Sequence, residues 1–228
     1  MQVLQARVGS EHYAEAGPAA GAQTGRIAQL APGVALPCFT MSFARNEEIF
    51  AEEEAADFVY QVISGAVRDV RILSDGRRQV GAFHLPGDVF GLDCGETHRY
   101  SAEAVVDSEI ALVRRTVLDR SAAADAAAAR KLWGLTSHDL QRLQDHMLLL
   151  GRKSAVERVA AFLISMAARG STDHTVDLPM SRSDIGDYLG LTIETVSRTL
   201  TQLERDHAIS MSGSRHITLH ERLFAVED

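Results

Sequence analysis

The stretch from Ser181 to Glu204 constrains the fold of this chain more than any other part of the sequence. Ser181 is typical of a helix N-cap, with Asp184 three residues later as its reciprocal partner. Gly190 is suited to the left-handed conformation that ends a helix, and Thr192 can then cap a second one. Two short helices joined by a turn of about three to four residues that contains glycine predict a helix-turn-helix.

The apolar residues of this stretch recur at helical spacing, so each helix has a face that can be buried. They are Ile185 and Leu189 in the first helix and Val196, Leu200 and Leu203 in the second, while Leu191 fills the turn between them. The opposite face of the second helix carries Ile193, Glu194, Ser197 and Arg198. Residues at the start of such a helix contact base edges in the major groove of DNA. We therefore expect these four residues to read bases.

The chemistry of these side chains suits DNA bases. Glu194 can accept a hydrogen bond from cytosine N4, Arg198 can donate to guanine O6 and N7, and Ile193 can contact a thymine methyl group. Each good pair gives about 1–3 kcal/mol of discrimination. The alternative is an ordinary surface ion pair between Glu194 and Arg198, four residues apart, worth about 0–1 kcal/mol. Their place on the second helix favours base reading.

Other polar residues of this region are placed to bind DNA phosphates. Arg182, Thr192 and Thr195 lie at helix N-termini, where free N–H groups favour anions. We assign them to backbone contacts, which fix the register without reading sequence. Residues 209–219 predict two strands around a glycine, a wing that would bring Arg215 or His216 near a phosphate.

The earlier part of the chain has a different pattern. From about residue 31 to 120, short strand-like runs alternate with turn residues. An Asp-Gly pair between the runs 66–73 and 79–85 strongly predicts a hairpin. The even spacing of the runs predicts a sandwich or barrel-like roll. Residues 1–30, rich in Ala, Gly and Gln, predict a flexible tail.

A helical segment over residues 121–151 separates the predicted roll from a C-terminal domain over 152–228. Its apolar residues alternate at spacings of three and four, which is the pattern of a coiled-coil seam. They are Trp133, Thr136, Leu140, Leu143, Met147 and Leu150. The alternative is a helix packed on its own domain. The polar character of its other faces favours a parallel pair of helices at a dimer interface.

The composition argues against several classes of protein. No apolar run approaches the ~20 residues that span a bilayer, and the N-terminus lacks the pattern of a secretory signal. We therefore expect a cytoplasmic protein without membrane contact. Cys38 and Cys94 have no metal-ligand spacing and are expected to be reduced thiols. No Ser/His/Asp set, metal triad or phosphate-binding loop is evident, so we expect neither an enzyme nor a bound cofactor or metal.

The net charge of −8 is unusual for a protein that binds DNA. Residues 151–228 carry nine Lys and Arg against eleven Asp and Glu, so most of the excess acid lies before residue 151. Net charge governs solubility and non-specific attraction, and does not tell whether one face is basic. Sequence-specific contacts would then have to supply much of the affinity.

Several segments carry a resemblance to one family. They are Ser74–Val80, Phe83–Gly91, Arg152–Leu163 and Leu178–Arg198. Through them the chain resembles the Crp/Fnr superfamily, and within it the FixK-like regulators. The resemblance implies an α+β fold, with an N-terminal, jelly-roll-like β-roll of the cyclic-nucleotide-binding type, a long dimerisation helix and a C-terminal winged helix-turn-helix. It also implies a homodimer on double-stranded DNA, at a palindrome with TTG at one end and CAA at the other. FixK-like members activate genes for microaerobic respiration, denitrification or nitrogen fixation by contacting RNA polymerase.

The chain departs from the family where its members bind effectors. Members that bind a cyclic nucleotide hold its phosphate with a Gly-Glu and an Arg-Ser pair. Here the first corresponds to Gly87-Asp88, and the second falls near His98-Arg99-Tyr100, with no arginine clearly aimed inward. Cyclic nucleotide binding is therefore not expected.

Other sensing chemistries of the family also lack their residues. Oxygen-sensing members have an N-terminal cysteine cluster, whereas this chain has only Cys38 there, which excludes a four-cysteine iron–sulfur site. Haem-binding members need an axial ligand in the roll, but His84 and His98 are better explained as structural. Ser181 and Ser183 start the helix-turn-helix, so a thiol switch at the DNA face is not available.

The leading hypothesis is an effector-independent activator whose abundance sets its output. The alternative is a transcription factor of the same superfamily that is gated by a cyclic nucleotide or another ligand in the roll. Repression remains open, because the geometry at each promoter decides between activation and repression.

Overall fold

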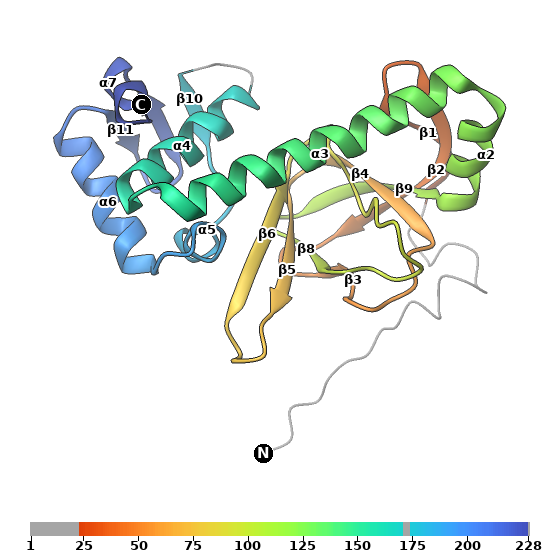
Figure 1. Ribbon diagram of the computed structural model, residues 1–228, viewed down its shortest axis with the longest axis horizontal. Coiled ribbons are helices and arrows are strands. Elements are labelled where there is room, and N and C mark those ends of the chain that lie inside the picture. Colours follow the sequence, from red (N-terminus) through yellow and green to blue (C-terminus); the bar gives the residue numbers. More distant parts are fainter. Residues whose placement is uncertain (1–22, 171–173, 228) are drawn as a thin grey trace. The chain divides into compact units, whose positions relative to one another are not determined.

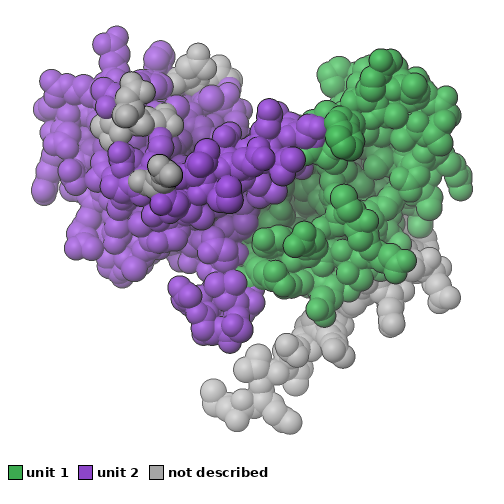
Figure 2. Space-filling model, in the orientation of Figure 1, with its two compact units in different colours: residues 1–71, 83–136 green, residues 72–82, 137–228 purple. Residues whose placement is uncertain are grey.

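The computed structural model describes residues 23–170 and 174–227, and the chain forms two compact units. Unit 1 comprises residues up to 71 together with 83–136, and unit 2 comprises residues 72–82 together with 137–228 (Figure 2). None of the helices in the described ranges is long and apolar enough to cross a lipid bilayer.

Unit 1 is built on two antiparallel sheets (Figure 1). The first has the strand order β1 (Gln23–Ala31), β2 (Val34–Phe43), β9 (Ser108–Arg114), β4 (Phe58–Ser64) and β7 (Val89–Phe90). The second has the order β3 (Glu48–Phe50), β8 (Ser101–Ala104), β5 (Val67–Ile72) and β6 (Arg78–His84), of which residues 78–82 belong to unit 2. The predicted β-roll is confirmed, including the hairpin that turns at Gly76 with a positive φ of 83°.

Alternation along the central strands creates two cores, because successive side chains of a strand point to opposite faces. On β9, Ile110 and Leu112 belong to an aromatic cluster, while Ala111 and Val113 belong to a second, aliphatic cluster. The aromatic cluster contains Phe43, Phe50, Phe58, Tyr60 and Phe90.

Two helices follow the roll, α2 (Arg115–Ala124) and α3 (Ala126–Arg152). The sequence predicted one helix from residue 121, but Asp125 takes an extended conformation and separates the two. Its carboxylate accepts a hydrogen bond from the Ala127 N–H at 2.8 Å, which satisfies one of the free donors at the start of α3. Ala128, Leu132 and Leu135 of α3 pack on the aliphatic cluster of unit 1.

The predicted tail needs a correction. Residues 23–30 are not a tail, because they form most of β1, which pairs with β2. Ala28 and Leu30 are buried and alternate with exposed Ile27 and Gln29. The sequence did not predict this strand, because its alternating segment is short and rich in Ala and Gln. Residues 1–22 of the predicted tail lie outside the described residues.

Unit 2 contains the C-terminal elements. After α4 (Ala155–Ala168) come β10 (Thr175–Asp177), α5 (Arg182–Leu189), α6 (Ile193–Arg205), β11 (Ile209–Ser212), β12 (His216–Leu219) and α7 (Glu221–Glu227). Strands β10, β12 and β11 form a small antiparallel sheet in that order. The buried face of α4 holds Val159, Phe162 and Leu163. The predicted helix-turn-helix and wing are both present.

Candidate nucleic-acid interface

The first helix of the helix-turn-helix, α5, starts with a reciprocal cap. The Ser181 hydroxyl accepts a hydrogen bond from the Asp184 N–H at 3.1 Å, and the Asp184 carboxylate accepts one from the Ser181 N–H at 3.0 Å. Two free donors of the first turn are thus satisfied, as the sequence predicted. This cap fixes the direction of α5 and the place of Arg182 in its first turn.

The turn between the two helices depends on two glycines. Gly190 ends α5 in the left-handed conformation with φ 64°, as predicted. Gly186, inside α5, was not singled out from the sequence. A Cβ at this position would lie 2.7 Å from the Leu191 carbonyl oxygen, so the turn packs directly on the helix backbone. Glycine at this position therefore sets the close approach of α5 to the start of α6.

The second helix, α6, begins at the cap that the sequence predicted. The Thr192 hydroxyl accepts a hydrogen bond from the Thr195 N–H at 3.2 Å. Val196, Leu200 and Leu203 are buried, so one face of α6 anchors it to the rest of unit 2. The opposite face is consequently turned outward.

The structure brings the four predicted base-reading residues together on that outward face. Ile193, Glu194 and Arg198 are exposed, with 47% of the Ile193 side chain accessible, and Ser197 is half-buried. The pKa of the Glu194 carboxyl is held below its ordinary value, first by the N–H of its own backbone and then by the Thr192 hydroxyl. The positive charge of Arg198 also acts on Glu194, as the smallest of the effects that lower the pKa of its carboxyl. Glu194 is therefore an ionised acceptor at neutral pH.

The predicted phosphate contacts lie at the starts of α5 and α6 and in the β11–β12 turn. Arg182 is half-buried, and its guanidinium donates to the Ser197 hydroxyl at 3.3 Å. Thr192 and Thr195 share a hydroxyl–hydroxyl hydrogen bond of 3.1 Å. Arg215 is exposed beside the β11–β12 turn. The neighbouring His216 forms a 2.7 Å hydrogen bond with Asp177 across the small sheet.

Two residues that the sequence did not single out hold α5 within unit 2. The His146 ring of α3 stacks on Tyr188 at 3.9 Å between centroids, and its Nε2 lies 2.8 Å from the Tyr188 carbonyl oxygen. Burial lowers the pKa of His146, so its neutral form donates this hydrogen bond. Arg158 of α4 donates to the carbonyl oxygens of Leu189 and Leu150. Neither role has a sequence signal, because the partners lie far apart along the chain.

The predicted dimer seam is a continuous stripe on α3. Trp133, Thr136, Leu140, Leu143 and Met147 are all exposed in the isolated chain, with 74% of the Trp133 side chain accessible. Leu150 is instead half-buried within unit 2. Exposed apolar side chains at this spacing need a partner surface.

The interior of the roll is filled by rings. His98 stacks on Phe50 at 3.7 Å between centroids, and His84 stacks on Phe90 at 4.9 Å. Each histidine is buried and hydrogen-bonds an aspartate at 2.9 Å, His84 with Asp69 and His98 with Asp93. Both histidines thus have structural partners, and no group of His, Cys, Asp and Glu in the described part of the chain could hold a metal ion.

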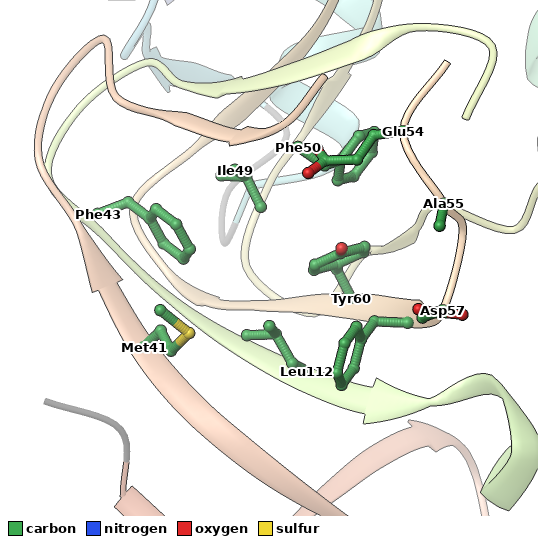
Figure 3. Close-up of a pocket in the computed structure, with 10 residues that line it drawn as sticks. Met41, Phe43, Ile49, Phe50, Glu54, Ala55, Asp57, Tyr60 and Leu112 are labelled. Atoms are coloured by element: carbon green, nitrogen blue, oxygen red, sulfur yellow. The ribbon is translucent and has the colours of Figure 1, made fainter. Parts of the chain in front are cut away.

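A pocket of unit 1 lies against these rings. Figure 3 shows Phe43, Ile49, Phe50 and Tyr60 around it. Its cavity volume is about 30 Å³, which is room for about one or two water molecules.

The cysteines and the residues near the expected effector positions also take internal roles or face solvent. Cys38 is buried and Cys94 exposed, and both are free thiols. Burial raises the pKa of the Cys38 thiol.

The Asp88 carboxylate accepts a hydrogen bond from the Leu85 N–H at 2.7 Å, and Arg99 is exposed.

A β-roll, a long helix and a helix-turn-helix with an outward recognition face define a class of protein, the helix-turn-helix transcription regulators. Residues 40–125 match the cyclic nucleotide-binding domain, and residues 157–223 match the Crp-like helix-turn-helix domain. The chain belongs to the Crp/Fnr family of transcription regulators.

Relatives with known roles place the chain near one branch of that family. It is 48% identical over 205 residues to the nitrogen fixation regulation protein FixK of Azorhizobium caulinodans, which covers 88% of this chain and 82% of the relative. FixK of Rhizobium meliloti is 44% identical and covers 80% of this chain and 83% of the relative. The structure of FixK2 from Bradyrhizobium japonicum has a TM-score of 0.81 at 52% identity and covers 85% of this chain and 98% of that structure. The predicted FixK-like resemblance is confirmed.

Proposed function

We propose that the chain is a cytoplasmic, homodimeric activator that binds a palindrome of the TTG and CAA type without a small-molecule effector. The observation that carries the proposal is the outward face of α6. Ile193, Glu194 and Arg198 are exposed at the start of the helix, while its opposite side is buried. Such a face can enter the major groove without any rearrangement of unit 2.

The side chains of this face fit the proposed half-site. Arg198 can donate to O6 and N7 of the guanine in TTG, and Glu194 can accept from N4 of a cytosine on the complementary strand. Ile193 can contact a thymine methyl group. Arg182, Thr192, Thr195 and Arg215 would bind the phosphates that fix the register of this face. The wing would thereby add a contact outside the recognition helix.

A palindrome requires two reading heads, each formed by α5 and α6 of one copy of the chain, related by a two-fold axis. The exposed stripe on α3 supplies a surface for a second copy of the chain, since its apolar residues follow the heptad spacing of parallel dimers. Two copies of α6 would then read half-sites about one helical turn apart, centre to centre.

Independence from an effector is supported by the interior of the roll. One cavity beside its rings has a volume of about 30 Å³, and its buried histidines are paired with aspartates of the same chain. A cyclic nucleotide would need an inward cation for its phosphate, whereas Arg99 is exposed. The alternative is a regulator gated by a ligand in the roll, which is supported by the match to the cyclic nucleotide-binding domain.

The relatives support a role in gene activation. The relatives named above are nitrogen fixation regulation proteins, and a further relative is a transcriptional activatory protein of Rhodopseudomonas palustris. We therefore expect this chain to activate genes of microaerobic respiration, denitrification or nitrogen fixation by contacting RNA polymerase.

The test is a fluorescence-anisotropy titration of purified, ligand-free protein. One duplex carries TTGA and TCAA half-sites about one helical turn apart, centre to centre, and a scrambled duplex of equal length is the control. Specific proteins of this kind bind with Kd of about 10⁻⁸–10⁻¹¹ M at physiological salt. Nanomolar, site-selective binding supports the proposal, including its independence from an effector. Equal, weak binding to both duplexes contradicts it and favours ligand gating.

A further inference from the structure

The tip of the β5–β6 hairpin, residues 72–82, belongs to the same compact unit as the helix-turn-helix (Figure 2). Arg78 at this tip contacts α5 through two carboxylates. Its Nη2 lies 2.6 Å from Asp184 and 2.7 Å from Asp187, and its Nε lies 2.8 Å from Asp187. The side-chain amide of Gln79 donates to the Asp187 carbonyl oxygen at 2.8 Å. The hairpin tip therefore contacts α5 through two adjacent residues, Arg78 and Gln79.

One of these carboxylates has two tasks. Oδ2 of Asp184 accepts hydrogen bonds from the N–H and the hydroxyl of Ser181, which closes the cap of α5. Oδ1 of the same carboxylate accepts from Arg78. Only 5% of the Asp184 side chain is exposed, so the guanidinium supplies the charge that offsets its loss of hydration. Without Arg78, this buried carboxylate would lose the cation that it contacts at 2.6 Å.

The cap in turn controls the reading head. Arg182, a proposed phosphate contact, occupies the first turn of α5 and donates to Ser197 on the proposed base-reading face. If the cap loosened, Arg182 would no longer be held in place, and its hydrogen bond to Ser197 of α6 would be lost.

We propose that Arg78 is a positioning residue for DNA binding, which it supports by fixing the N-terminal turn of α5 from the hairpin tip. The inference rests on the proposed function, since it assigns a role within the same DNA-binding site. Arg78 itself need not touch DNA.

The chain offers a matched control beside this residue. Arg77 is also an arginine of the hairpin tip, but 77% of its side chain is exposed and it pairs with Asp75 in the turn. Arg77→Ala and Arg78→Ala remove the same charge one position apart. Arg78→Lys keeps the charge but cannot span both carboxylates with a planar fork.

The experiment measures hydrogen exchange of the α5 amides in the free, full-length variants, and their anisotropy on the palindromic duplex. We expect exchange in α5 to be about tenfold faster in Arg78→Ala than in Arg77→Ala, with site affinity reduced about tenfold, and intermediate values for Arg78→Lys. Should Arg78→Ala fail to fold, Asp187→Asn and Gln79→Ala each remove part of this contact and are measured in the same way.

Each outcome decides the inference. Equal exchange in the Arg77 and Arg78 variants overturns it, as does faster exchange in α5 with unchanged affinity for a palindrome that the wild type binds. If the wild type does not bind the palindrome, the proposed function fails, and the exchange rates alone decide whether Arg78 fixes α5.

Discussion

The roll of unit 1 and the reading head of unit 2 use their polar side chains in opposite ways. Inside the roll, His84, His98 and Arg68 each have an acidic partner of the same unit, namely Asp69, Asp93 and Glu103. On α6, the side chains of Glu194 and Arg198 are exposed to solvent. Internal pairing rigidifies a domain, whereas polar groups left free can bind a partner. The comparison indicates that recognition in this chain belongs to unit 2.

The largest effect is expected from a substitution in the predicted dimer seam on α3. Leu143→Glu places a charge in the stripe that we assign to the dimer, so each pair of helices would bury two carboxylates. We expect monomers by light scattering and a loss of palindrome affinity of about 10²–10⁴-fold, because each half-site would bind alone. Gln144→Glu adds the same charge next to the seam and should leave the dimer intact. A stable dimer of Leu143→Glu would show that the stripe has another role.

The recognition face gives the next test. Arg198→Ala should cost about 1–3 kcal/mol on the palindrome and far less on scrambled DNA, because a base contact is lost rather than a phosphate contact. Anisotropy titrations on both duplexes at the same salt concentration measure the difference. Arg205→Ala, in the last turn of the same helix, is the control. Equal losses on both duplexes would reassign Arg198 to the DNA backbone.

A smaller effect is expected from pH through His146. Burial lowers its folded-state pKa, so the stabilisation is complete above the unfolded value of about 6.5 and is lost as the pH falls through the folded value. His146→Phe keeps a ring on Tyr188 but cannot titrate. Between pH 8 and pH 5, the Tm of the wild type should fall relative to this variant, by a few degrees at most. His138→Phe, at an exposed site of α3, should follow the wild type.

The roll should give no effect at all. We expect cAMP and cGMP at millimolar concentration to leave the Tm unchanged, since the rings fill the interior. A ligand at 100 times its Kd would add about 2.7 kcal/mol of stability and raise the Tm by about 5–10 °C. The palindromic duplex is the positive control. Such a shift with either nucleotide would reverse the comparison between the two regions and support a gated regulator.

Local patterns predicted the parts of this molecule that are built from neighbouring residues. The caps at Ser181 and Thr192, the stop at Gly190 and the buried face of α6 all follow from spacings within one or two helical turns. The strand β1 was missed because its alternation uses small residues. The helical break at Asp125 was missed because one residue in an alanine-rich segment carries little signal.

Contacts between distant residues could not be predicted in this way. Arg78 and Asp184 are 106 positions apart, and His146 and Tyr188, which stack and share a hydrogen bond, are 42 positions apart. A sequence pattern indicates which face of a helix or strand is apolar, but it does not indicate which side chain of another element contacts that face. The residues that support the helix-turn-helix could therefore not be predicted from the sequence, whereas the proposed base-reading face could.

The close approach at Gly186 bears on how this chain can change over evolutionary time. Any side chain there would meet the Leu191 carbonyl oxygen and displace the turn that leads into α6. The proposed base-reading positions 193, 194 and 198 are exposed and can change without such a clash, whereas position 186 admits only glycine. Substitutions at these exposed positions are therefore expected to leave the turn between the two helices unchanged.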